Sequence, residues 1–135
     1  MAILVDGYEN ELLDGLTGVT QLTTPAIVYL ALFTADPTDT GSVTDELTSS
    51  GYARQSIAGL FSAATGTNGT SSNTSEINFA AATGDWDGVT HVGFMVSDVE
   101  TTDDMMSNIQ LDASITILNG QTFTFAVGSL TLVAD

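Results

Sequence analysis

The sequence contains no cysteine and no lysine, and its only cationic side chain belongs to Arg54. The absence of cysteine excludes disulfide bonds, thiolate metal sites and thiol catalysis. No apolar run approaches the ~20 residues that a membrane-spanning helix needs. The N-terminus lacks a basic region, and Ile3-Leu4-Val5 is too short for the apolar core of a signal peptide. We therefore expect neither a signal peptide nor a membrane partner.

Positive charge is almost missing from a chain with 17 acidic residues, and the formal net charge is −16. Such a surface repels phosphate backbones, which argues against nucleic-acid binding. Two explanations of the charge stay open: it maintains solubility, or it suits a salty medium that screens the repulsion. At 43% hydrophobic residues the chain is nonetheless too apolar for a disordered acidic tail.

The length of 135 residues indicates one domain that can bury a core without cross-links. Short segments rich in Thr, β-branched and aromatic residues alternate with turn signals. This pattern predicts an all-β fold, an antiparallel β-sandwich of the jelly-roll or immunoglobulin-like kind with a short N-terminal helix. Residues 1–24 are expected to form the helix and a connection, and residues 25–135 the sandwich.

Seven segments have the composition of strands. The first is almost wholly apolar and ends at Asp36-Pro37, where proline fixes a corner. The clearest alternation places Val92, Phe94 and Val96 on one face of a strand. Asn119-Gly120 predicts a hairpin between two late strands. The expected strands are residues 26–35, 51–61, 76–81, 89–96, 113–118, 122–127 and 130–134, with a Gly/Ser/Thr/Asn loop expected to be exposed at residues 62–74.

Leu12, Leu13 and Leu16 follow one another at helical spacing, with acidic residues between them. The pattern predicts an amphipathic helix over residues 8–16 that ends at Gly15 or Gly18. The leucine stripe either caps one end of the sheet core or docks onto a neighbouring subunit.

An acidic, turn-rich segment at residues 36–50 is the best candidate for calcium, because carboxylate oxygens are the ligands that calcium prefers. The spacing does not match an EF-hand loop, so a solvated surface loop is the default and we expect no metal. The candidate ligands are Asp36, Asp39, Asp45 and Glu46.

Three side chains, and after them a pair of methionines, attract attention; each of the three is the only one of its kind in the chain. Arg54 can either hold carbonyls and carboxylates within its own chain or bridge to an acid on the next subunit. His91 is the sole candidate general base, but no nucleophile-elbow or metalloprotease motif accompanies it, so we expect a structural histidine. Trp86 is expected to pack over the sheet end. Met105 and Met106 either begin a strand or lie at a contact surface.

Five motifs occur in a fixed order along the chain. In these motifs, and over nearly its whole length, the chain resembles a group of small tailed-phage virion proteins usually described as structural or tail-fibre-like. The motifs are NELLDGL at residues 10–16, YLALFTADPT at 29–38, GYARQ at 51–55, TGDW followed by VTHVG within 83–93, and GQTFTF followed by GSL within 120–130.

The resemblance departs at residues 97–112, where members of the group have a Gly-rich turn and this chain has an acidic segment ending in Met105-Met106. The resemblance implies a virus particle assembled in the host cytoplasm, with other virion proteins as partners. The shared motifs do not indicate any chemical reaction, and we expect neither enzymatic activity nor a cofactor.

Two structural roles remain, because buried carboxylate pairs with aromatic sugar platforms, as a glycosidase needs, are not indicated. The first is a capsid decoration protein that binds the major capsid protein as a homo-oligomer, for example a trimer. The second is a tail-associated or fibre-like protein. Compactness favours decoration on the capsid surface, because the chain has no long repeats from which to build a shaft.

Overall fold

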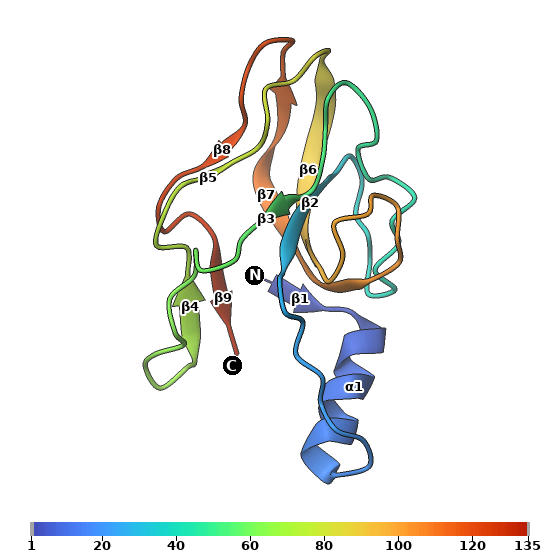
Figure 1. The fold of residues 1–135 in the computed structure, drawn as a ribbon, viewed down its shortest axis with the longest axis vertical. Coiled ribbons are helices and arrows are strands. Elements are labelled where there is room, and N and C mark those ends of the chain that lie inside the picture. Colours follow the sequence, from blue (N-terminus) through green and yellow to red (C-terminus); the bar gives the residue numbers. More distant parts are fainter. Residues whose placement is uncertain (1, 135) are drawn as a thin grey trace.

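The computed structural model describes residues 2–134 and consists of antiparallel strands with one short helix near the N-terminus (Figure 1). The predicted all-β fold with an N-terminal helix is therefore confirmed. In chain order the elements are β1 (Ala2–Leu4), α1 (Asp6–Thr17), β2 (Tyr29–Phe33), β3 (Gln55–Ser56), β4 (Thr70–Ser72), β5 (Ile77–Asn78), β6 (Trp86–Met95), β7 (Met105–Ile117), β8 (Thr124–Phe125) and β9 (Thr131–Val133).

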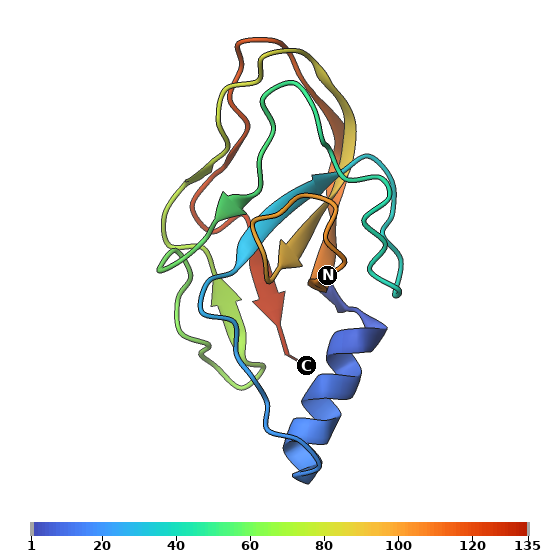
Figure 2. The ribbon, with the colours of Figure 1, turned by 45° about the vertical axis from the view of Figure 1, so that its right-hand side comes forward.

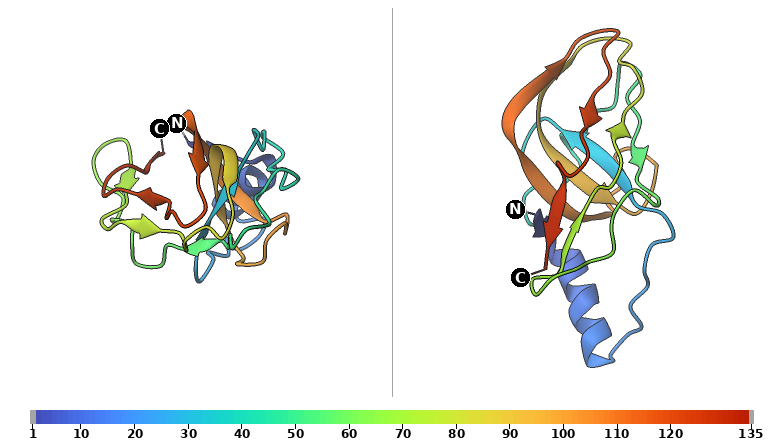
Figure 3. Two further views of the ribbon diagram at one scale, coloured as in Figure 1. Left: turned by 90° about the horizontal axis from the view of Figure 1, so that it is seen from above. Right: turned by 90° about the vertical axis from the view of Figure 1, so that its left-hand side faces the viewer.

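The strands form one large sheet and two small ones. The large sheet has the order β1-β7-β6-β2-β3, and its neighbouring strands are antiparallel. The small sheets are the ladders β4–β9 and β5–β8. Figure 3 shows both ladders as a second layer in front of the large sheet. The fold is therefore built from two facing layers.

The main core fills the space between these layers. Alternate residues of β2, Leu30 and Leu32, point into it and are fully buried. They meet Val92 and Phe94 of β6, as the alternation of that strand predicts. The second layer contributes Ile77, Phe79, Phe125 and Leu130.

A second, smaller core lies on the opposite face of β2. Ala31 and Phe33 pack there against Met95, Met105 and Val5. A Cβ on Gly93 would lie 2.8 Å from a ring carbon of Phe33 and 2.9 Å from the Met105 methyl group, so only glycine fits beneath them. Because both faces of β2 are covered, its sequence is a nearly continuous run of apolar residues.

The strand boundaries differ from the predicted ones. The strands expected at residues 26–35, 51–61 and 122–127 are shorter in the structure, where they are β2, β3 and β8. The flanking residues have the composition of strands, but no neighbouring strand pairs with them. β7 begins at Met105, as one interpretation of Met105-Met106 predicts, and continues without a break into the strand expected from residue 113. The polar residues Ser107 and Asn108 interrupt the hydrophobic pattern of this strand, although both are buried between β1 and β6. Val96, expected on the same strand face as Val92 and Phe94, lies beyond the end of β6 and is 44% exposed.

The predicted hairpin at Asn119-Gly120 was wrong. A turn does form there, but β7 pairs with β1 and β6, whereas β8 pairs with β5. Gly120 donates to Ala82 O and Gln121 O accepts from Ala82 N–H, so the chain crosses to the other layer at this turn. The exposed loop expected at residues 62–74 also contains β4 and, at its end, the buried Asn73.

Helix α1 starts at the sheet and extends away from it (Figure 2). Its first turn is fixed by hydrogen bonds from Val5 N–H to Met106 O and from Asp6 N–H to Asp39 O. It ends at Gly18, one of the two predicted stops, where φ is +76° and the left-handed conformation favours glycine. Only Tyr8, in the first helical turns, packs against both cores.

Candidate functional site

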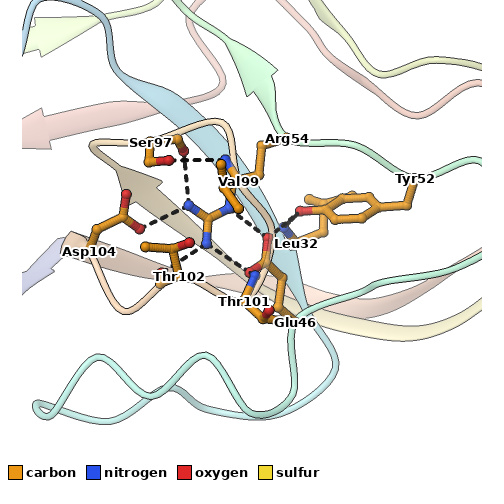
Figure 4. Close-up of polar contacts among 9 residues, drawn as sticks. All are labelled: Leu32, Glu46, Tyr52, Arg54, Ser97, Val99, Thr101, Thr102 and Asp104. Carbon is orange, nitrogen blue, oxygen red and sulfur yellow. Dashed lines mark hydrogen bonds and ion pairs between the residues drawn. The ribbon is translucent and has the colours of Figure 1, made fainter.

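Arg54 lies at the centre of a buried polar cluster, which we call the Arg54 cluster: Glu46, Tyr52, Arg54 and Asp104 (Figure 4). The guanidinium binds Glu46 through two parallel bonds, Nε to Oε1 at 2.8 Å and Nη2 to Oε2 at 2.9 Å. Nη1 donates to Asp104 Oδ1 and to Ser97 O, each at 2.9 Å, and Nη2 donates to Thr102 O at 3.1 Å. All five guanidinium donors therefore have acceptors.

The carboxylate of Glu46 is satisfied as fully as the arginine. Besides Arg54, it accepts hydrogen bonds from the Tyr52 hydroxyl (3.1 Å) and from the backbone N–H of Thr101 (2.8 Å). The Tyr52 oxygen in turn accepts from Leu32 N–H in β2. The cluster thus ties the acidic segments at residues 36–50 and 97–104 to β2.

Of the two roles considered for Arg54, the geometry matches the internal one, since every donor is used within the chain. Burial alone would lower the pKa of Arg54, but the hydrogen bonds that it donates to Glu46 and Asp104 outweigh that effect and raise the pKa, which keeps the guanidinium charged. The acidic segment in which the sequence departs from the phage group is therefore held by this single cation.

Burial, assisted by the charge of Glu46, raises the pKa of Tyr52 well above its ordinary value of 10.0. Once the pH exceeds 10, unfolded Tyr52 loses its proton while folded Tyr52 keeps it, so stability must fall as pH rises. We expect Tyr52 to contribute a slope approaching about 1.4 kcal/mol per pH unit in denaturant unfolding above pH ~10.

Comparison with Tyr52→Phe isolates this effect, because the chain has no lysine to titrate in the same range. That variant should be less stable at neutral pH but should lose the alkaline slope, whereas Tyr29→Phe should retain it. An equal slope in wild type and Tyr52→Phe would contradict the assignment.

The candidate calcium ligands do not assemble. Glu46 is bound to Arg54, and Asp36 Oδ1 accepts a hydrogen bond from Thr38 N–H. Among residues 2–134, no three acidic or histidine side chains lie where they could hold a metal ion together. The carboxylates of residues 36–50 therefore do not come together as a set of ligands in the described structure, and Arg54 takes the one buried carboxylate of that segment.

His91 and Trp86 both lie inside the protein. The Nδ1 atom of His91 lies 2.9 Å from the Thr90 hydroxyl, and its Nε2 lies 3.8 Å from Asp36 Oδ1. Trp86 is 1% exposed, packs edge-on against Tyr52 and donates from Nε1 to Ser50 O at 3.0 Å. Both side chains contact protein groups in the way that a structural role requires.

Met105 and Met106 begin β7, as one of the two interpretations held, but they do not form an exposed contact. Their exposed fractions are 6% and 9%, and because they are successive strand residues they enter opposite cores. The proposed methionine contact surface was therefore wrong.

The leucine stripe of α1 does not cap the core. Leu12 is half-buried, whereas Leu13 and Leu16 are 59% and 78% exposed, and none of the helix residues, all of them described, is buried. The sheet-capping interpretation was wrong because only the first turns of the helix reach the sheets. Docking onto another molecule remains as the second interpretation.

An apolar groove of about 530 Å³ opens beside the base of α1. It runs between the first helical turns, residues 25–28, and the β4–β9 ladder, and it reaches the core residues Phe94 and Met106. None of its lining residues that the structure describes carries a charge. The groove and the helix are the parts of the described chain best suited to an apolar contact. Within residues 2–134, no helix is long and apolar enough to cross a membrane.

Asn73, which no sequence pattern singled out, is 1% exposed and forms hydrogen bonds with backbone groups of the turn at residues 126–130. Its side chain donates to Ser75 O and Ala126 O and accepts from Leu130 N–H. Glu46, a candidate calcium ligand in the sequence, is the partner of Arg54. The sequence feature that could have indicated this pairing is the presence of a single cation among many acidic residues, because a buried cation needs an acidic partner.

The family of the chain follows from a comparison with protein-family models. Residues 4–133 match the family described as podophage GP4 fiber I protein gp80. No curated protein matches the chain. The matched region includes both layers of the sandwich, α1 and the Arg54 cluster, which agrees with the resemblance to phage virion proteins. The chain thus belongs to a family of phage structural proteins, the podophage GP4 fiber I protein gp80 family.

Proposed function

We propose that this protein is a non-enzymatic structural component of a phage tail fibre, in which it acts as a compact connecting domain. The observation that carries the proposal is the family match, which spans residues 4–133 and names a fibre protein. It favours the tail-fibre alternative over capsid decoration, which the sequence analysis had placed first.

The compactness that favoured decoration has another explanation in a fibre. A fibre shaft needs an elongated or repetitive chain, and this one is a two-layer domain whose longest strands, β6 and β7, have 10 and 13 residues. A domain of this shape suits a joint or an attachment point between other virion components.

Its surfaces suit such a joint. Helix α1 extends away from the sheets (Figure 2) and carries the exposed Leu13 and Leu16, and the uncharged groove lies at its base. The segments at 36–50 and 97–104 carry exposed acidic residues, which can meet a basic partner surface. The contacts available are therefore apolar at the exposed leucines and the groove, and acidic at these two segments.

Immunogold labelling of purified particles, with heads and tails scored separately, tests this proposal. We expect label on the tail fibres, and none after the antibody has been preadsorbed with the purified protein. Label spread over the head would overturn the fibre assignment and establish decoration.

A further inference from the structure

The connection between β6 and β7, residues 97–104, wraps around the guanidinium of Arg54 (Figure 4). We call this connection the strap. We propose that the strap opens and closes while both cores stay folded, and that ionic strength sets the balance, with low salt opening it and high salt closing it. The inference goes beyond the proposed function and does not depend on it.

The strap is attached to the rest of the domain by polar contacts. Arg54 donates to two of its carbonyls and to Asp104, and Thr101 N–H donates to Glu46. None of its residues, all of them described, is buried or belongs to either core, and its one apolar residue, Val99, is 60% exposed. Breaking these contacts would free the strap and leave both cores intact, as in other segments that open locally.

Two features of the closed strap oppose closure. Thr101 has a φ of +59°, a left-handed conformation that a β-branched residue rarely adopts. The strap also carries four acidic residues, and the segment at 36–50, which it contacts through Glu46, carries four more. Arg54 is the only Lys or Arg that can balance them. Closure brings these like charges together, so Arg54 holds the strap against both backbone strain and repulsion.

Salt acts differently on the attraction and on the repulsion. The side chains of Arg54 and Glu46 are 0% exposed, and salt screens buried pairs only weakly. In contrast, Asp45, Asp98 and Asp103 are exposed, so mobile ions reach them. The Debye length falls from about 30 Å at 0.01 M salt to about 3 Å at 1 M. Added salt therefore removes most of the repulsion and little of the attraction, which favours the closed strap.

A basic surface that lies on both acidic segments would act in the same direction as salt. It would neutralise their exposed carboxylates, and it finds the two segments together only when the strap is closed. Binding of such a surface and closure of the strap would therefore favour each other. In this way the strap couples contact with a cationic partner to the order of the Arg54 cluster.

Hydrogen exchange measured by NMR tests the inference, with rates divided by those of the free peptide 97–104 in the same buffer. The Thr101 amide is bonded to Glu46 only in the closed strap, whereas Val92, in β6, reports unfolding of the main core. We expect Thr101 to exchange faster than Val92 at every salt concentration. Its exchange should be about tenfold faster at ~0.01 M than at ~1 M NaCl, the effect of a few exposed like-charged pairs.

Neutralising the exposed acids of the strap tests the origin of the salt effect. Asp98→Asn/Glu100→Gln/Asp103→Asn removes three charges and leaves the groups that Arg54 binds unchanged. The Thr101 amide of this variant should stay protected at low salt and should lose most of its response to salt, because little repulsion remains to be screened.

The matched control is Glu11→Gln/Glu76→Gln/Asp112→Asn, which removes three exposed charges outside both segments and should respond to salt as wild type does. Exchange of Thr101 that equals that of Val92 at every salt concentration would show that the strap does not open separately, and it would overturn the inference. Protection independent of salt would overturn it too, as would a salt effect equally large in the strap variant and the control. These outcomes do not depend on which part of the particle contains the protein, so failure of this inference is distinguishable from failure of the fibre assignment.

Discussion

Replacing Arg54 with methionine should lower the free energy of unfolding by about 3–5 kcal/mol, the usual cost of removing one partner from a buried ion pair. Glu46 would remain buried without its cation, and the carbonyls of Ser97 and Thr102 would lose their donors. The chain has no other Arg or Lys to take over this position. Urea unfolding followed by circular dichroism measures the loss.

Three variants show whether geometry or charge causes this effect. Arg54→Lys keeps the charge but has three donors in place of five, so an intermediate loss of stability is expected. Removing both partners in Arg54→Met/Glu46→Met should recover part of the loss, because no buried charge is left unpaired. Glu76→Gln, which removes an exposed carboxylate, is the control. An Arg54→Met protein as stable as Glu76→Gln would show that the cluster contributes little.

Proteolysis gives a second readout of the same cluster. Arg54 is the single site in the sequence at which trypsin can cut, and it is buried. Native protein should resist trypsin, whereas Glu46→Gln should be cut into residues 1–54 and 55–135 because the guanidinium is released more often. Glu76→Gln should resist cleavage as wild type does.

Replacing Trp86 with alanine should also cost about 3–5 kcal/mol, in the range measured for large aromatic side chains removed from cores. Trp86 is 1% exposed and joins the start of β6 to Ser50, which lies between Glu46 and Tyr52 of the Arg54 cluster. Its ring meets Tyr52 edge-on at a centroid distance of 5.7 Å. The cavity would therefore open beside a tyrosine that itself binds Glu46.

Trp86→Phe separates packing from hydrogen bonding. It keeps an aromatic ring but removes one of the two donors to Ser50 O, which still accepts from Thr83 N–H. A smaller loss is therefore expected, with about 0.5–1.5 kcal/mol from the missing hydrogen bond. Val127→Ala, at a position that is 62% exposed, should change stability by less than about 0.5 kcal/mol. Circular dichroism is the suitable probe, because both tryptophan variants lose the only indole. Equal stability of wild type and Trp86→Ala would contradict the core placement.

The residue that stood out in the sequence for its rarity, Arg54, is the centre of the polar cluster, but its partners could not be read from the sequence. Glu46 lies eight residues away and Asp104 lies fifty. The chain offers 17 carboxylates, and nothing local distinguishes these two from the others. Loop closure and burial select them, and both are properties of the whole fold.

Helix α1 likewise has features that the local sequence predicts and others that only the tertiary structure decides. Leucine spacing and Gly18 predicted the helix and one of its possible ends, because both depend on local geometry. Which surface the leucines would face depended on where the helix starts relative to β1 and β7. The capping interpretation failed for that reason, and exposed leucines beside an uncharged groove became visible only in the structure.

The sequence by itself determined the all-β class, the N-terminal helix, the near absence of cations and the order of motifs shared with phage proteins. These follow from composition and short-range periodicity, which each segment carries independently of the others. The tertiary structure decided strand pairing, the crossing at Asn119-Gly120, the burial of Met105 and Asn73, and the partners of Arg54. Those depend on contacts between residues far apart in the chain, whose energies local patterns do not encode.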